Sequence, residues 1–390
     1  MNAATNWRRV APVALWYSLT LATGICSPEI LAALIKPAPG GLGLSISTAG
    51  VLLTVEMIAN GAFGLAARLF DRHSSRTLIF AGFLATFLAD VATAGVSGLA
   101  PLIALRVVAG AGLGVVTIAV SRFVAASENP DRLSSLLLVT STLLSGAVLV
   151  AFGNSSPSAI AVFLTLAGLA VLGLATTPLA AGGYAKAVVE TPGSGTAPGA
   201  PALLPGLFLI AAAGLLNTAD SGLYALTSVI GEHAGVGEKM LGYILTAAMV
   251  AGVIAAVAAG RLRSAASRSK GLVGSILVKA CVSFTIVRVA GAGGFGAMAI
   301  LSSFTLFYAM PLLLGASAHL DRRGRLVAQV SGALQIGGAL GPAWAGGLAE
   351  VAGMRAEAMV CAALLVVSAL LCLMPFRIVR DLVHAARATT

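Results

Sequence analysis

Five ionisable side chains lie well inside long apolar stretches of the sequence, where charged groups are uncommon: Glu56, Asp90, Arg106, Asp220 and Lys279. Because burying a charge away from water costs free energy, each of them is a candidate functional residue. A carboxylate that loads and releases protons needs apolar surroundings, which disfavour its charged form. We therefore expect Glu56 or Asp220 to carry protons. Arg106 stays charged and is expected to pair with one of these acids.

Polar side chains also recur at helical spacing in these stretches. Glu56 and Asn60 are four residues apart, so they share one face of a helix. A longer stripe follows Asn217 at helical intervals and includes Asp220, Ser221, Tyr224 and Ser228. Later stretches add Ser303, Tyr308, Ser331 and Gln335. Such stripes must face protein or water, because lipid cannot satisfy their hydrogen bonds.

A structural role competes with each of these assignments. Arg106, Glu56 and Asp220 could form ion pairs that only hold helices together. For Asp90 and Lys279 the structural interpretation is favoured, and Lys279 could neutralise a carboxylate or extend toward the membrane surface.

Composition indicates what kind of chain holds these residues. Of the 390 residues, 58% are hydrophobic and 10% are charged, and the mean hydropathy is +0.98. Soluble proteins carry about 25% charged residues. The sequence therefore predicts an all-α membrane protein that crosses the bilayer many times. The cysteines and histidines have no metal-ligand spacing, so no metal or cofactor is expected.

Windows of about 20 apolar residues, the length that spans a bilayer, predict twelve membrane helices. In the first half they are 10–35, 46–67, 77–97, 101–126, 134–153 and 158–178. In the second half they are 205–231, 239–260, 272–290, 294–316, 326–350 and 357–376.

The two halves are related by an internal repeat. An offset of 193 residues places Pro12 on Pro205 and Arg132 on Arg325. Between the halves, residues 180–204 are rich in proline, glycine and small polar residues, which is typical of a linker. We predict a six-helix bundle at 1–179, a linker at 180–204 and a second bundle at 205–390. Parallel six-helix repeats of this kind are typical of transporters that bind their substrate between the halves.

The basic residues predict the orientation of the chain in the membrane. Most of the 24 Lys and Arg residues fall in loops on one side, together with both termini and the linker. Because positive loops stay in the cytoplasm, we expect both termini there, in a bacterial inner membrane. The net charge of +10 is then a topology signal, and no nucleic-acid partner is expected.

Two segments resemble motifs of the major facilitator superfamily. Residues 67–76, Ala-Arg-Leu-Phe-Asp-Arg-His-Ser-Ser-Arg, are similar to the G-x-L-x-D-R-x-G-R-[RK] loop after the second helix of that family, although both glycines are replaced. Residues 105–114, Leu-Arg-Val-Val-Ala-Gly-Ala-Gly-Leu-Gly, resemble the helix-four pattern of its proton-coupled members. The glycine–proline pattern that antiporters carry in helix five is missing there, and a similar run occupies 337–347.

The resemblance implies a fold of two six-helix pseudo-repeats and a role for several residues. It implies that Asp71, Arg72 and Arg76 form a cytoplasmic gate contact. It also implies that the polar stripes line a central cavity. The implied substrate contacts are Asn60, Asn217, Tyr224, Tyr308, Gln335 and Arg106.

These observations together predict a secondary transporter, acting as a monomer, that moves a small organic solute by alternating access. The chain shows no nucleotide-binding segment, so protons are the expected energy source. Efflux by antiport is the favoured direction. The alternative is a symporter or facilitator that takes up an organic acid or sugar, with Arg106 and Lys279 as an anion site. A transporter-fold sensor or scaffold, or a membrane-embedded enzyme, would need long loops or a catalytic cluster that the sequence does not show.

Overall fold

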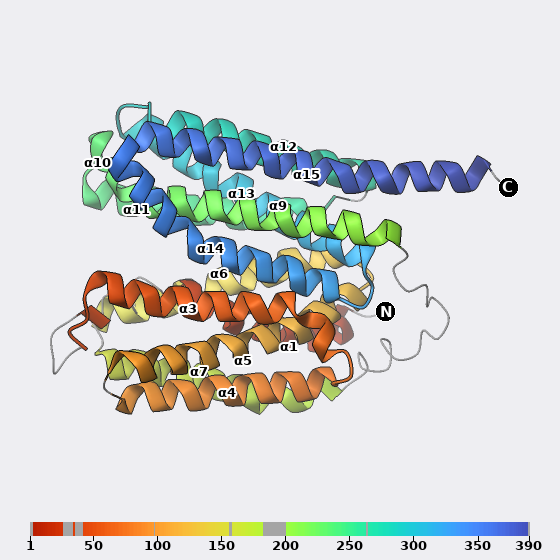
Figure 1. Cartoon of the computed structure of the whole chain (residues 1–390), viewed down its shortest axis with the longest axis horizontal. Coiled ribbons are helices and arrows are strands. Elements are labelled where there is room, and N and C mark those ends of the chain that lie inside the picture. Colours follow the sequence, from red (N-terminus) through yellow and green to blue (C-terminus); the bar gives the residue numbers. More distant parts are fainter. Residues whose placement is uncertain are drawn as a thin grey trace. The chain divides into compact units, whose positions relative to one another are not determined.

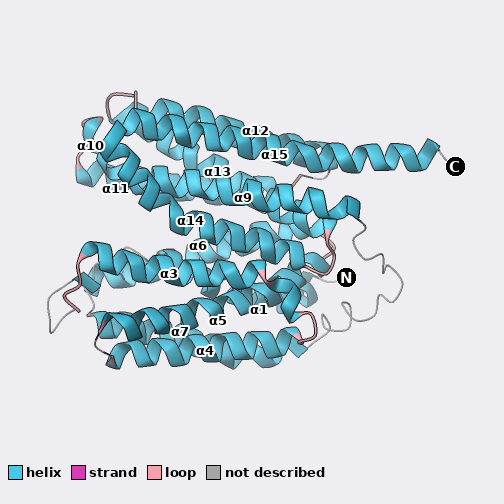
Figure 2. Ribbon diagram, viewed as in Figure 1, coloured by secondary structure: helices cyan, strands magenta, loops and turns pink. Residues whose placement is uncertain are grey.

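The computed structural model describes residues 3–25, 34–35, 42–96, 98–155, 158–181, 200–262 and 264–388. Within these ranges the chain is helical, with no strand (Figure 2). The first half contains α1 (Ala3–Ile25), α3 (Ile46–Leu65), α4 (Ser75–Gly95), α5 (Leu99–Ala126), α6 (Pro130–Ser155) and α7 (Ala159–Thr176), with short 3-10 helices η1 (Ala67–Phe70) and η2 (Thr177–Ala181). The second half contains α9 (Ala200–Ala225), α10 (Thr227–His233), α11 (Glu238–Ala259), α12 (Ala265–Ile286), α13 (Ala292–Leu320), α14 (Arg325–Ala352) and α15 (Met354–Ala388).

Each of the twelve predicted membrane segments coincides, over most of its described residues, with a helix. Among the described residues, nine helices are long and apolar enough to cross a membrane, and the other three predicted segments fall on α1, α6 and α14. One prediction was wrong in detail, because the segment 205–231 is interrupted at Leu226, between α9 and α10. Most of the predicted helix after Ile25, and most of the predicted linker, lie outside the described residues.

Serine side chains define where several helices begin. Ser45, Ser74, Ser158 and Ser264 precede α3, α4, α7 and α12, and each hydroxyl accepts a hydrogen bond from the backbone N–H three residues later. These bonds satisfy N–H groups that have no partner within the helix. Each of these four helices therefore begins with a capping residue that the sequence already supplies.

The turns between α4 and α5 and between α12 and α13 are built alike. Gly98 precedes α5 with φ of 109°, and Gly291 precedes α13 with φ of 81°. Only glycine adopts this region of φ without strain. The two glycines are also separated by the 193-residue offset of the internal repeat, so the repeat extends to backbone conformation.

The described helices divide into two compact units (Figure 1). Unit 1 comprises residues 1–128, 137–192 and 322–336, and unit 2 comprises 129–136, 193–321 and 337–390. The first turns of α6 therefore belong to unit 2, while the first part of α14 belongs to unit 1.

In unit 1, α5 packs closely against α3 and α4. Trp16 of α1 is 1% exposed and donates from Nε1 to Oγ1 of Thr176, 3.0 Å away, which ties α1 to α7. In unit 2, α15 packs against α9 and α12, and α11 packs against α13. Large apolar side chains such as Leu88, Leu164 and Ile254 are exposed on the outer faces, as expected where helices meet lipid.

Candidate functional site

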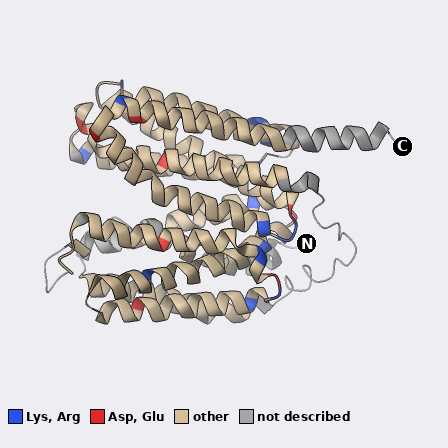
Figure 3. Cartoon of the chain, viewed as in Figure 1, with Lys and Arg blue, Asp and Glu red and all other residues tan. Residues whose placement is uncertain are grey.

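Arg106 of α5 is the centre of a buried charge cluster in unit 1. Its Nη1 lies 3.2 Å from Oε2 of Glu56 on α3, and its Nη2 lies 2.8 Å from Oδ1 of Asp90 on α4. All three residues are only 2% exposed. Three neighbouring helices therefore each contribute one charged side chain to the same point, in a region where charged residues are otherwise few (Figure 3).

Neutral groups complete the surroundings of the guanidinium. Nη2 also donates to Oγ1 of Thr93, 2.6 Å away, and the Thr93 hydroxyl donates to the carbonyl oxygen of Ala89. The ring of Phe163 on α7 covers the guanidinium, with its centroid 4.8 Å from Cζ. The cluster is thus enclosed by protein, where electrostatic interactions are stronger than in water.

The charges of this cluster do not balance when both acids are ionised. Glu56 and Asp90 then carry two negative charges against the single positive charge of Arg106. An unbalanced buried ion costs several kcal/mol even after the protein relaxes. Binding one proton on either carboxylate makes the cluster neutral, so the arrangement can bind and release a proton.

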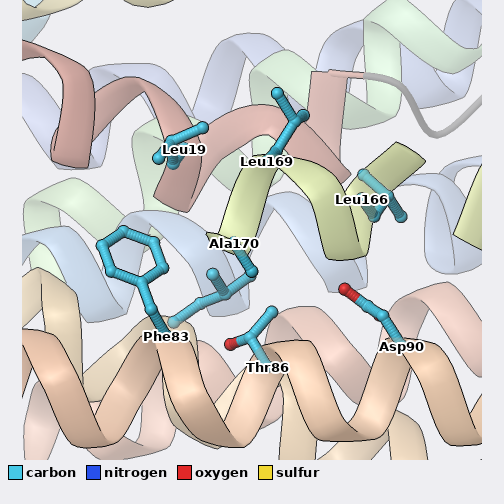
Figure 4. A pocket seen from close by; sticks show the side chains of 8 residues that line it. Leu19, Phe83, Thr86, Asp90, Leu166, Leu169 and Ala170 are labelled. Atoms are coloured by element: carbon cyan, nitrogen blue, oxygen red, sulfur yellow. The ribbon is translucent and has the colours of Figure 1, made fainter. Parts of the chain in front are cut away.

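Asp90 also lines a small pocket inside unit 1, between α1, α4, α5 and α7 (Figure 4). The pocket is lined by Leu19, Phe83, Thr86, Asp90, Leu113, Leu166, Leu169 and Ala170. Among these described lining residues, Asp90 and Thr86 are the polar ones, and the Asp90 carboxyl group points from α4 toward α7 (Figure 4). The Asp90 carboxyl group therefore belongs both to the charge cluster and to the lining of this pocket.

Unit 2 contains a second buried pair. Nζ of Lys279 on α12 lies 2.5 Å from Oδ1 of Asp220 on α9. The same ammonium group donates to Oγ and to the carbonyl oxygen of Ser302 on α13, at 2.9 and 3.1 Å. The Lys279 side chain is 1% exposed and that of Asp220 is 18% exposed. These three acceptors use the three hydrogens of the ammonium group. Because its side chain is more exposed, Asp220 is the accessible member of the pair.

These pairings bear on the alternative anion site of Arg106 and Lys279. Each cation contacts carboxylates of its own unit, and both are buried. Neither presents an uncompensated positive charge in this structure.

The predicted substrate residues divide between the two units. Asn60 and Gln335 lie in unit 1 with Arg106, and Asn60 is 4% exposed with its Oδ1 lacking a hydrogen-bond partner among the described residues. Asn217, Tyr224 and Tyr308 lie in unit 2. Tyr224 is 64% exposed, whereas Tyr308 is half-buried and stacks on Phe304 with ring centroids 6.1 Å apart. Neither unit alone therefore contains all of the predicted substrate residues.

The predicted gate loop is held to the start of α14. Asp71 accepts from Nε of Arg325 at 2.9 Å, and its other carboxylate oxygen pairs with Nη2 of the same arginine. Arg122 of α5 donates to the carbonyl oxygens of His73 and Phe70, at 2.7 and 2.8 Å. Arg72 and Arg76, which we expected in this contact, are exposed. From the sequence, Arg325 was named only as the repeat partner of Arg132.

A comparable contact in unit 2 was not anticipated. Asp131, in the first turn of α6, pairs with Nη1 of Arg268 at 2.9 Å and with Nε2 of His319 at 3.3 Å. Its side chain is 6% exposed. This cluster could not be predicted from the sequence, because its members come from three helices that are distant along the chain.

For Asp90 we favoured a structural ion pair, without naming its partner. The structure pairs it with Arg106, whose guanidinium also contacts Glu56. A signal was available, because Asp90 and Arg106 lie at similar distances on either side of the turn at Gly98. Two consecutive antiparallel helices place residues that are equally far from their connecting turn side by side.

No protein-family model matches the chain, and no curated protein matches it. Several solved structures match the chain. The human organic anion transporter MFSD10 (TETRAN) matches with a TM-score of 0.69 and 15% identity, over 94% of this chain and 99% of that chain. The major facilitator superfamily transporter FucP, in the outward conformation, matches with a TM-score of 0.70 and 13% identity, over 94% and 98%. The proton:xylose symporter XylE matches with a TM-score of 0.68 and 14% identity, over 95% of both chains.

These likenesses span nearly the whole chain. The protein therefore has the all-α membrane fold of major facilitator superfamily transporters, as the sequence motifs predicted.

Proposed function

We propose that this protein is a proton-coupled secondary transporter of a small organic solute, and that it works by alternating access of its two halves. The observation that carries the proposal is the cluster of Arg106 with Glu56 and Asp90. A buried cluster of one guanidinium and two carboxylates is neutral when one proton is bound and negatively charged when that proton has left. A group that changes charge in this way couples proton movement to a conformational equilibrium.

The fold supports a transporter rather than an enzyme, since the similar structures are all named as transporters. Two of them, XylE and FucP, are described as proton symporters. In a multi-pass protein of a bacterial inner membrane, the membrane potential supplies about 2.3 kcal/mol per charge per 100 mV. That is enough to drive accumulation or export of a solute.

Export by antiport is the direction we propose, on the helix-four pattern that contains Arg106. Uptake by symport is the second candidate, and the symporter names of XylE and FucP favour it. In either case Asn60, Asn217, Tyr224, Tyr308 and Gln335 are the proposed solute contacts, with Asp220 as a further proton-carrying acid.

The sign of a pH change tests the proposal and its direction. The purified protein is reconstituted in de-energised liposomes with a trapped pH dye, and candidate solutes are added outside while their entry is followed with a radiolabel. Interior alkalinisation during solute entry indicates exchange for protons and supports antiport. Interior acidification indicates symport. Solute entry without a pH change contradicts proton coupling.

Matched variants then locate the proton. We expect E56Q and D90N each to abolish the pH change, because each leaves one carboxylate permanently paired with Arg106. D220N tests the other acid. If E56Q, D90N and D220N all keep the full pH change per solute, the assignment of these acids is wrong.

A further inference from the structure

Glu357 and Cys361 form a buried polar pair at the start of α15, in unit 2. Both side chains are 0% exposed. Sγ of Cys361 lies 2.9 Å from Oε1 of Glu357 and 3.3 Å from the carbonyl oxygen of Ala219 on α9. Neither residue belongs to the sites described above.

The number of hydrogens available to the two side chains indicates which of them carries a proton. A thiol has one hydrogen, and a backbone carbonyl oxygen only accepts. If the thiol donates to Ala219, the hydrogen between Sγ and Oε1 must be carried by Glu357. Both contacts of Cys361 are then hydrogen bonds only when Glu357 is a neutral carboxylic acid that donates to sulfur.

The surroundings of Glu357 point the same way. Its second oxygen, Oε2, has no hydrogen-bond partner among the described residues. An ionised Glu357 would have a single thiol as donor, which is a weak one. A buried carboxylate with so little compensation takes up a proton instead.

The charged groups on the helices packed against α15 do not compensate Glu357 either. The ionisable residues of α9 are Asp220, whose charge has the same sign as that of an ionised Glu357, and Tyr224. On α12, Lys279 gives its three hydrogens to Asp220 and Ser302. On α15 itself, Arg355 is exposed.

We infer that Glu357 binds a proton, and that the Glu357–Cys361 pair is a second proton-binding site, located in unit 2 and distinct from the Arg106 cluster of unit 1. The inference rests on the hydrogen bonds and burial of these two residues and does not depend on the proposed transport function.

Infrared difference spectroscopy tests the inference directly, with purified protein in lipid nanodiscs at neutral pH. We expect E357Q to lose a C=O stretching band of a protonated carboxyl group. We also expect the S–H stretching band of Cys361 to shift in E357Q. E350Q is the matched control, since Glu350 is an exposed glutamate outside the sites described above, and it should leave the protonated-acid band in place. Loss of carboxylate bands in E357Q, with the acid band unchanged, would overturn the inference.

A second variant keeps the test decisive if E357Q does not fold. C361A retains Glu357 but removes the sulfur that accepts its hydrogen, so the acid C=O band should persist at a shifted frequency. An acid band that does not move in C361A contradicts the proposed bond. Because these spectra need no transport, a missing band combined with normal proton exchange rejects this site alone. A band present in a protein that moves no protons rejects the proposed function alone.

Discussion

Arg325, the first residue of α14, forms a two-point ion pair with Asp71 in the turn that follows α3. In unit 2 the corresponding contact has the opposite polarity. There the acid, Asp131, lies at the start of α6 and the base, Arg268, lies at the start of α12. The turn after α3 thus contributes an acid, whereas the start of α12 contributes a base. Each pairs with the opposite charge at the start of α14 or of α6.

The exposure of Asp71 and Arg325 limits what their pair contributes to stability. The side chains are 34% and 22% exposed, so we expect a coupling energy of about 0.5 kcal/mol, as for other solvent-accessible pairs. A double-mutant cycle with D71N and R325Q, followed by thermal unfolding in detergent, measures it. The parallel cycle with D71N and R72Q is the control and should be additive. A coupling energy of several kcal/mol would show that the pair is buried in solution.

The Arg106 cluster should behave very differently, because its members are buried. R106Q leaves Glu56 and Asp90 facing each other without a cation, and we expect it to lower the free energy of unfolding by about 3–5 kcal/mol. E56Q or D90N alone leaves one acid for one base, so each should cost much less. Removing both acids should again be costly, because Arg106 then has no counter-charge.

Thermal unfolding of the four variants checks this order. The triple variant E56Q/D90N/R106Q should recover part of the loss seen in R106Q, since no charge remains to be buried. If R106Q is as stable as the unsubstituted protein, the ion pairs of Arg106 do not form in solution.

The fold was predictable from the sequence to a greater extent than the site. Hydropathy predicted the approximate positions of the long helices, and the serine caps before α3, α4, α7 and α12 mark where several begin. The split after Ala225 was not predictable, because residues 205–231 are continuously apolar enough to suggest a single helix.

Which charged residues meet depends on how helices are arranged, and hydropathy does not contain that information. The contact between Asp90 and Arg106 follows from one short turn and could have been inferred. The contacts of Glu56 with Arg106 and of Asp220 with Lys279 join helices that are not consecutive. Sequence alone supplied their residue types but not their partners.

The two side chains of the Asp220–Lys279 pair differ in exposure, and a further prediction follows from this difference. D220N leaves an ammonium group that is 1% exposed without a counter-ion, whereas K279M leaves a carboxylate that is 18% exposed and can be hydrated. We therefore expect D220N to cost about 3–5 kcal/mol of stability and K279M clearly less. Chemical denaturation of both variants measures the difference. D220N/K279M should be more stable than D220N, and the reverse order of the single variants would contradict the burial of Lys279.

The glycines of α5 give the last prediction, because they set the distance between α5 and α3. A Cβ added at Gly110 would collide with the backbone carbonyl of Glu56, and one at Gly114 would lie 2.6 Å from the carbonyl oxygen of Asn60. Backbone atoms cannot give way as a flexible side chain can, so G110A must push α5 from α3 and separate Arg106 from Glu56. We expect a loss of about 1–3 kcal/mol in stability, typical of overpacking.

Gly168 on α7 offers a matched control. A Cβ there meets nothing within 4 Å, and alanine favours helix more than glycine does. Thermal unfolding should therefore show G168A to be as stable as the unsubstituted protein, or slightly more stable, while G110A unfolds at a lower temperature. Equal stabilities of G110A and G168A would mean that α3 and α5 are not in close backbone contact, and that Glu56 reaches Arg106 from a greater distance.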